Sequence, residues 1–171
     1  MPAYNIIAQN TENTVVSEYT PLPKRAEAYQ SEAQLEKEFI RLLCEVGYTY
    51  LPIHTEADLV ANLRTQLEKL NNYQFTDGEW ERFFQQSIAN ANEGIKEKTR
   101  RIQDGDTAQA FKRDTGESKN IRLLDKKCIH NNTLQVINQY TVSQAEGAAH
   151  DNRYDVTILV NGLPLVHVEL K

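Results

Sequence analysis

Apolar residues in the first two thirds of the chain recur every three or four positions, the spacing of one face of an α-helix. Three such stripes are present: Leu35, Phe39, Leu42, Leu43 and Val46; Leu59, Leu63, Leu67 and Leu70; and Trp80, Phe83, Phe84 and Ile88. We expect these leucine and aromatic stripes to form core rather than to bind a cofactor. A fourth, more charged helix is predicted from Ile95 to Ile102.

A hydroxyl residue precedes each stripe, and a polar residue follows it three positions later, as in an N-terminal capping box. The pairs are Ser31 with Gln34, Thr55 with Asp58, and Thr76 with Glu79. Gly47 stands where a left-handed cap would end the first helix. The helices are therefore predicted to begin just after Ser31, Thr55 and Thr76.

From Asn120 onward the pattern changes to one typical of strands. Strands are predicted over 120–124, 133–137, 154–160 and 163–170, with a short one over 14–19, a strand or extended connection over 48–53, and a loop opening at Gly105 and Asp106. Asn161-Gly162 is a favoured two-residue hairpin turn. Helices first and a mostly antiparallel sheet last predict an α/β or α+β layered domain. Without repeats or linkers, we expect one domain over 1–171, helical over about 31–104 and sheet over about 120–171.

The composition adds little to the predicted fold, whereas the distribution of charge bears on which partners the chain can bind. The net charge is −5, which argues against a general nucleic-acid binder. Only residues 93–127 are basic, with ten Lys or Arg against seven Asp or Glu. Neither a membrane span nor a secretory signal is recognisable, and Cys44 and Cys128 are expected to be small buried hydrophobic residues in a reducing cytoplasm. Other subunits or domains would have to supply much of any attraction to DNA.

The sequence contains none of the common phosphate-loop, dinucleotide, nucleophile-elbow or HExxH motifs. What stands out is the last hairpin, where charged residues interrupt two apolar strands: Asp155 near its start, and Glu169 and Lys171 at its end. Glu169 and Lys171 lie two apart and would share one face of a strand. Buried carboxylate and ammonium groups are costly unless they are paired or have a task. His167, between the acids, is expected to be a packed or surface residue.

Metal-assisted phosphodiester hydrolysis is a task that fits these residues. Mg²⁺ prefers oxygen ligands and takes one or two carboxylates, so Asp155 and Glu169 are candidate ligands. Lys171 would orient the attacking water and stabilise charge on the phosphate. From the Glu-x-Lys triplet alone, a solvated pair at a strand end is a better interpretation than a metal site. Asp155, the Asn-Gly turn and the apolar context make the two interpretations about equally good.

The register of the hairpin tests this hypothesis. A regular two-residue turn would place Asp155 opposite Val168 and turn Glu169 to the other side of the sheet. We therefore predict a three-residue loop with a bulge near Pro164, pairing Val160 with Pro164 and bringing Asp155 opposite Glu169.

The segment from Asn152 to Lys171 resembles the nuclease motif of HsdR, the restriction (R) subunit of type I restriction–modification enzymes. Weaker similarities lie at Tyr29–Glu32, Leu35-Glu36 and Leu124–Lys127. The resemblance implies a restriction-endonuclease-like fold of the PD-(D/E)xK superfamily, a mixed sheet flanked by helices. It implies catalytic roles for Asp155, Glu169 and Lys171, and a metal-binding carbonyl at Leu170.

The same resemblance implies a bacterial, cytoplasmic enzyme. In it, ATP-driven helicase-like motor domains follow the nuclease, and methyltransferase (M) and specificity (S) subunits assemble with it on double-stranded DNA. The ATP site lies outside this sequence. Tyr154 replaces the proline of the superfamily motif, and the chain looks like a fragment that ends at Lys171, so we expect it to be inactive alone.

Further residues carry weaker expectations. Glu32 or Glu36 on the first helix could add a carboxylate to the metal site, although a solvated helix face is the simpler interpretation. Lys126 and Lys127 could contact DNA phosphates or be solvated. Two alternatives to the restriction nuclease also stay open, namely a non-catalytic docking domain of the same complex and another PD-(D/E)xK nuclease.

Overall fold

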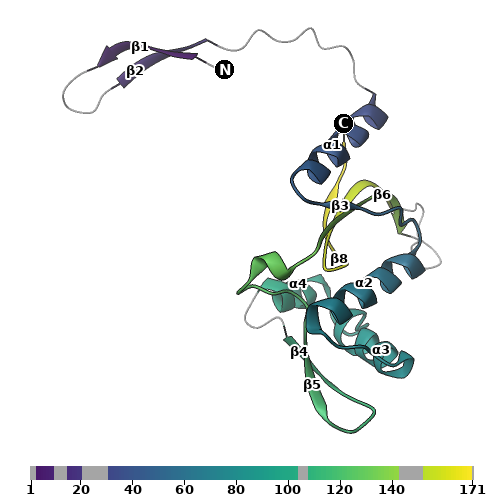
Figure 1. The fold of residues 1–171 in the computed structure, drawn as a ribbon. Coiled ribbons are helices and arrows are strands. Elements are labelled where there is room, and N and C mark those ends of the chain that lie inside the picture. Colours follow the sequence, from purple (N-terminus) through teal and green to yellow (C-terminus); the bar gives the residue numbers. More distant parts are fainter. Residues whose placement is uncertain (1–2, 10–14, 21–30, 104–107, 143–151, 171) are drawn as a thin grey trace.

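The computed structural model describes residues 3–9, 15–20, 31–103, 108–142 and 152–170 (Figure 1). Its helices are α1 (Glu32–Glu45), α2 (Glu56–Asn71), α3 (Asp77–Phe83), which continues as a π-helical turn η1 (Phe84–Ile88), α4 (Ile95–Gln103) and a 3₁₀ turn η2 (Ile129–Asn131). Its strands are β1 (Ala3–Gln9), β2 (Val15–Thr20), β3 (Thr49–Tyr50), β4 (Ala108–Lys112), β5 (Ser118–Arg122), β6 (Leu134–Val142), β7 (Asn152–Val160) and β8 (Leu163–Val168).

The main sheet has the order β3-β6-β7-β8. β6, β7 and β8 are antiparallel neighbours, whereas the short β3 runs parallel to β6. Two separate antiparallel pairs, β1 with β2 and β4 with β5, complete the described strands. The molecule therefore has an α/β fold with mixed sheets, as the sequence predicts.

The predicted helix starts are confirmed. The hydroxyl of Ser31 accepts the N–H of Gln34 at 3.3 Å, and the Gln34 side chain accepts the N–H of Ser31 at 3.1 Å. Thr76 and Glu79 form the same reciprocal box at the start of α3, while Thr55 caps α2. Gly47 has φ +104°, as expected just past the end of α1.

The stripes of α2 and α3 do form core, but the stripe of α1 does not. Leu35, Phe39 and Leu43 are half-buried, whereas Leu42 and Val46 are 46% and 72% exposed. The expectation of a buried α1 face was therefore wrong for its outer residues. The physical reason is that α1 rests on the sheet through contacts with β3 and β7, and this contact is narrower than the stripe. The expectation that Cys44 and Cys128 are buried was wrong as well, since both are exposed.

Several strand boundaries differ from those predicted. The predicted 120–124 strand is β5, which begins at Ser118 and ends at Arg122, and its partner β4 was missed. β8 ends at Val168 rather than Leu170. The predicted 14–19 strand corresponds to β2, with Thr14 outside the described residues, as are Gly105 and Asp106 of the predicted loop.

The core has two parts that α2 joins. The larger cluster packs α2 and α3 against β4, β5 and the start of β8, and its buried members are Leu63, Leu67, Phe75, Trp80, Phe83, Phe111, Ile121, Leu123 and Leu163. The smaller one packs the beginning of α2 on the main sheet through Ile53, Leu59, Ile137, Tyr140 and Leu159. Leu159 belongs to the smaller cluster and Leu163 to the larger one, so α2 packs against the β7–β8 hairpin on both sides of its turn.

Candidate functional site

The turn between β7 and β8 is a regular two-residue turn. Asn161 and Gly162 have φ +51° and +81°, and Val160 pairs with Leu163. Such left-handed pairs match the natural twist of a hairpin. The predicted three-residue loop, with Val160 opposite Pro164, is therefore wrong.

The side chain of Asn161 explains why this turn forms. It is buried, and its amide nitrogen donates to the carbonyl of Leu123 at 3.1 Å and to Oδ1 of Asn132 at 2.8 Å. Its Oδ1 accepts the N–H of Thr133 at 2.8 Å. Hydrogen bonds from distant residues thus fix Asn161 in the turn, and sequence spacing alone could not reveal them.

A one-residue slip nevertheless occurs, further along β8. Leu159 pairs with Pro164 and Ile158 pairs with Val166, so Leu165 is an extra residue with no partner on β7. Pro164 has no N–H to give to the ladder, which favours an irregularity beside it. Val156 then pairs with Val168, the last pair of the ladder, and continuing this register by one step would bring Asp155 opposite Glu169. The slip that the predicted juxtaposition requires is therefore present, but at a different bulge.

Asp155 reaches across to the chain that follows β8. Its Oδ2 accepts the N–H of Leu170 at 2.8 Å. Asp155 is half-buried, whereas Glu169 is exposed. Lys171 lies outside the described residues, so the structure gives it no position. The site thus contains one anchored and one exposed carboxylate, on facing residues at the open end of the hairpin.

Of the two candidate acids on α1, Glu32 and Glu36, the structure brings only Glu36 onto the sheet. Its Oε1 accepts the side-chain amide of Asn138 at 2.6 Å, and its Oε2 accepts that of Gln139. Glu32 is exposed in the first turn of the helix. Gln139 lies on β6 between residues that pair with Tyr154 and Val156, and is therefore beside Asp155.

His167 lies on β8, two residues before Glu169. Its ring stacks on Tyr154 with centroids 4.0 Å apart, and its Nδ1 lies 3.0 Å from the hydroxyl of Thr157. Partial burial lowers the pKa of His167 below its ordinary value of 6.5. A neutral imidazole at pH 7 adds no positive charge beside the carboxylates. The expectation of a packed or surface histidine is confirmed.

The donors present fit a hard cation such as Mg²⁺. Two facing carboxylates with a neighbouring main-chain carbonyl are oxygen ligands, and Mg²⁺ commonly binds through one or two carboxylates while keeping several waters. Among the described residues, no three Asp, Glu, His or Cys side chains converge closely enough to enclose a metal ion. Two carboxylates and one carbonyl would leave the remaining positions around such an ion to water and substrate.

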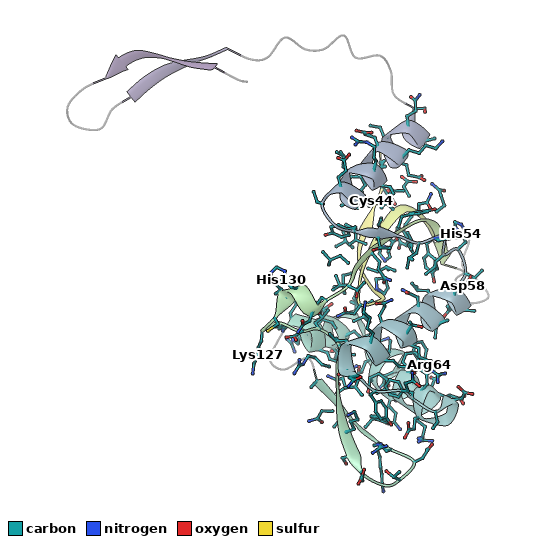
Figure 2. All side chains as sticks on the ribbon, viewed as in Figure 1. Cys44, His54, Asp58, Arg64, Lys127 and His130 are labelled. Atoms are coloured by element: carbon teal, nitrogen blue, oxygen red, sulfur yellow. The ribbon has the colours of Figure 1, made fainter. Side chains whose placement is uncertain are left out.

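Lys126 and Lys127 lie at the other end of the hairpin. They belong to a loop organised by Asp125, whose carboxylate accepts the N–H groups of Lys127 and Cys128 at 3.1 and 3.0 Å. The loop is hydrogen-bonded to Asn161 at the turn, whereas Asp155 lies on β7 six residues before Asn161, about 20 Å from it at the rise of a strand. Figure 2 shows Lys127 and His130 on the outer side of this loop, away from Cys44 on α1.

The two lysines also differ from each other. Both are exposed, but Lys126 donates from Nζ to the carbonyl of Gln103 at 2.8 Å and so caps the end of α4. The structure therefore does not bring either lysine to the carboxylates.

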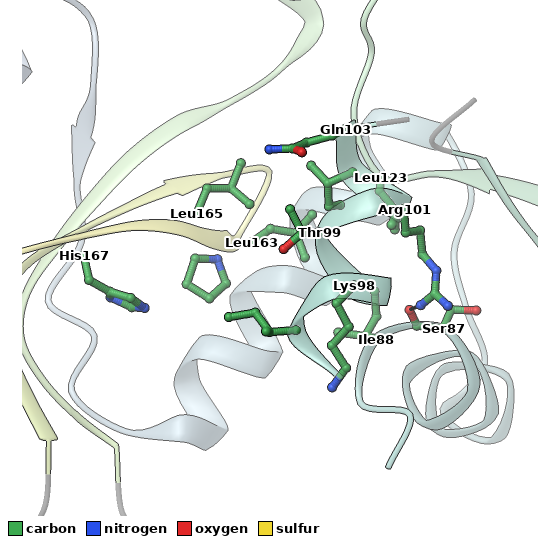
Figure 3. Close-up of a pocket in the computed structure, with 13 residues that line it drawn as sticks. Ser87, Ile88, Lys98, Thr99, Arg101, Gln103, Leu123, Leu163, Leu165 and His167 are labelled. Atoms are coloured by element: carbon green, nitrogen blue, oxygen red, sulfur yellow. Dashed lines mark hydrogen bonds between the residues drawn. The ribbon is translucent and has the colours of Figure 1, made fainter. Parts of the chain in front are cut away.

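A cavity of about 610 Å³ lies between α4 and the start of β8 (Figure 3). It is lined mainly by apolar residues, with Lys98 and Thr99 on α4 and His167 on β8. Neither Asp155 nor Glu169 belongs to its lining. The cavity thus borders the candidate site without containing it.

Comparison with known proteins identifies the family. A model described as the type I restriction enzyme R protein N terminus matches residues 29–171. The chain belongs to this family. The match covers the described region from α1 to β8, and it also includes Glu169 and Lys171, which follow β8.

Individual members of the type I restriction family show the same relationship. The chain is 45% identical over 166 residues to the type I restriction enzyme EcoprrI endonuclease subunit of Escherichia coli, covering 96% of this chain and 51% of that protein. It is 38% identical over 148 residues to the SsaAORF53P endonuclease subunit of Staphylococcus saprophyticus, covering 84% and 15%. The chain thus spans about half of the first relative and a smaller part of the second. No described helix of this R-protein N terminus is long and apolar enough to cross a membrane.

Proposed function

We propose that this chain is the endonuclease module of a type I restriction R subunit, hydrolysing DNA phosphodiester bonds with Mg²⁺. The observation that carries the proposal is the bulge at Leu165, after which Val156 pairs with Val168 and Asp155 accepts the N–H of Leu170, so that Asp155 and Glu169 lie at the same end of the hairpin. Membership of the R-protein family favours this assignment over another nuclease of the PD-(D/E)xK superfamily.

The proposal gives each candidate residue a role. Asp155, anchored on the N–H of Leu170, and the exposed Glu169 would hold the cation, with the carbonyl of Leu170 as a further ligand. A bound Mg²⁺ supplies Lewis-acid polarisation of the phosphate and lowers the pKa of a bound water. Lys171 would orient the attacking water and stabilise the charge that develops on the phosphate. Glu36 is the preferred accessory acid over Glu32, because it alone is seated on the sheet.

The larger assembly follows from the family rather than from this chain. We propose that the whole subunit carries an ATP-driven motor, and that methyltransferase and specificity subunits join it on double-stranded DNA in the bacterial cytoplasm. Lys127 is exposed and lies in the loop that contacts the turn end of the hairpin, so it is a candidate contact to DNA outside the cutting site. Lys126 is a weaker candidate because its ammonium already binds Gln103.

The test is Asp155→Asn in the full-length subunit, assembled with its partners. Removing a metal-binding carboxylate should lower DNA cleavage by at least about 100-fold. ATP hydrolysis and DNA translocation should stay near wild type. Glu169→Gln should behave in the same way, and Asp77→Asn, at an exposed position of α3, is the matched control that should cleave normally. Full cleavage by both Asp155→Asn and Glu169→Gln would refute the proposed site.

A docking role is the second candidate, and exposed apolar side chains favour it. Val46 on α1, Ile95 on α4 and Ile129 on η2 are 72%, 82% and 66% exposed. If the domain only docks, Asp155→Asn should leave cleavage unchanged, whereas charged replacements at these apolar positions should reduce assembly. The same set of variants therefore separates the two functions.

A further inference from the structure

Two adjacent amide side chains on β6 bind one carboxylate from α1. Asn138 donates to Oε1 of Glu36 and Gln139 donates to its Oε2. Successive residues of a regular strand point to opposite faces of the sheet, so two neighbours of regular geometry would not reach the same group. The shared contact therefore requires a local change in the backbone.

Gln139 provides that change. Its φ of +55° is left-handed, a conformation uncommon for residues other than glycine and typical of positions where function retains strain. Asn138 is held from its other side, since its Oδ1 accepts the hydroxyl of Tyr50 on β3 at 2.9 Å. The distortion in β6 thus has a visible result, which is the convergence of two amides on Glu36.

The position of this contact links it to the candidate metal centre. Gln139 stands beside Asp155 on the neighbouring strand, and Asp155 stands opposite Glu169 on the next. Neighbouring strands are about 4.8 Å apart, so the row from Gln139 to Glu169 is about 10 Å long. Glu36 lies at the β6 end of this row.

We propose that Asn138 and Gln139 are positioning residues that hold the Glu36 carboxylate one water away from the metal centre. There it accepts a hydrogen bond from a water of the hydrated cation. This inference rests on the proposed function. It agrees with the finding that no three described acidic side chains enclose an ion, because Mg²⁺ commonly keeps several of its waters.

A purely structural role would give a different result. If the amides only fasten α1 to the sheet, their removal should lower the stability of the fold and leave cation affinity unchanged. If they position Glu36, their removal should weaken cation binding through Glu36 alone. A double-mutant cycle separates these cases.

The test measures Mn²⁺ binding to the full 171-residue chain by electron paramagnetic resonance, with thermal unfolding recorded for each variant. Gln139→Gly removes the amide and keeps the left-handed backbone, which glycine adopts freely. We expect this variant to raise the Kd for Mn²⁺ by about 10-fold, the usual effect of losing an outer-shell partner, with the midpoint of unfolding unchanged. Glu36→Gln should weaken binding at least as much, and the double variant should bind no more weakly than Glu36→Gln.

Two controls define the outcomes. Asn72→Gly removes a side chain from another left-handed residue, the cap of α2, and should leave the Kd unchanged. Asp155→Asn should abolish binding. A wild-type chain that binds no Mn²⁺, or that binds it equally well after Asp155→Asn, would overturn the proposed metal site and this inference with it. Normal binding by Gln139→Gly, or additive losses in the double variant, would overturn the positioning role alone.

Discussion

At the scale of single residues, Asn161 and Gly162 form a turn and also make tertiary contacts that hold the turn in the fold. The sequence predicts that they form a hairpin turn, which is confirmed. It does not predict that the side chain of Asn161 joins three chain segments, or that Gly162 lies against the backbone of α2. A Cβ atom on Gly162 would lie 2.6 Å from Cα of Leu63. Both properties depend on contacts with residues far away in the sequence.

Gly162→Ala should therefore destabilise the protein strongly. The variant combines a left-handed φ with a collision against main-chain atoms, and we expect it to lower the free energy of unfolding by about 3 kcal/mol. Gly116→Ala is the matched control, since Gly116 has φ +88° but its Cβ atom would meet nothing within 4 Å. It should cost only about 1 kcal/mol. Urea unfolding measures both, and equal losses would show that the approach to α2 is unimportant.

At the scale of elements, local rules succeed where the interaction is itself local. The starts of α1, α2 and α3 could be predicted because each cap and its partner are three residues apart. The π-helical turn after α3 could not, because Phe84 and Ile88 fit an ordinary helical stripe equally well. In the fold, Arg101 of α4 binds the carbonyl of Ser87 within this turn and pairs with Glu93, and both contacts are tertiary.

The candidate site shows the same division. The facing of Asp155 and Glu169 could be predicted, since it needs only one slip in the register. The location of that slip could not, because the buried contacts of Asn161 decide the form of the turn. The choice of Glu36 over Glu32 likewise depends on Asn138 and Gln139, which are about a hundred residues further along the chain.

The start of α3 and the β4–β5 hairpin meet at one buried carboxylate, that of Glu79. It accepts the hydroxyl of Tyr73 at 2.6 Å and the N–H of Asp114 at 3.0 Å. The hydrogen bond from Tyr73, followed by the one from Asp114, holds the pKa of Glu79 below its ordinary value of 4.5 despite burial. A lowered pKa means that the ionised form is favoured in the folded state.

The contribution of Glu79 to stability should thus be complete above its unfolded pKa and should be lost as the pH falls below about 4.5. We expect Glu79→Gln to lower the midpoint of thermal unfolding at pH 7 and to flatten its decline between about pH 5 and pH 3. Glu81→Gln, an exposed neighbour on α3, is the control that should keep the wild-type slope. An unchanged slope in Glu79→Gln would contradict the assignment.

At the scale of the whole molecule, charge and cation binding are linked. The chain carries a net charge of −5, and its candidate site adds two facing carboxylates that repel each other when no cation is bound. Because a cation binds the folded form, it should stabilise the fold as well as fill the site.

Calcium also binds oxygen ligands, so the stability of the chain with and without calcium measures cation binding independently of DNA cleavage. At about 100 times the Kd, it should stabilise the chain by about 2.7 kcal/mol, which for a protein of this size raises the unfolding midpoint by about 5 to 10 °C. Asp155→Asn should remove this shift, while Asp58→Asn on α2 should retain it. If calcium raised the unfolding midpoint of Asp155→Asn as much as that of the wild type, the bound calcium would lie outside the proposed site.

The bulge at Leu165 has a consequence for how this hairpin can vary among related sequences. Thirteen residues separate Asp155 from Glu169. Since Leu165 has no partner on β7, its deletion would leave a continuous ladder in which every facing pair, including the two acids, is kept. An insertion in the same strand would instead carry the second acid to the opposite side of the sheet. Homologues with functional hairpins should therefore show a spacing of twelve or thirteen residues, and one-residue lengthening should be selected against unless the turn changes with it.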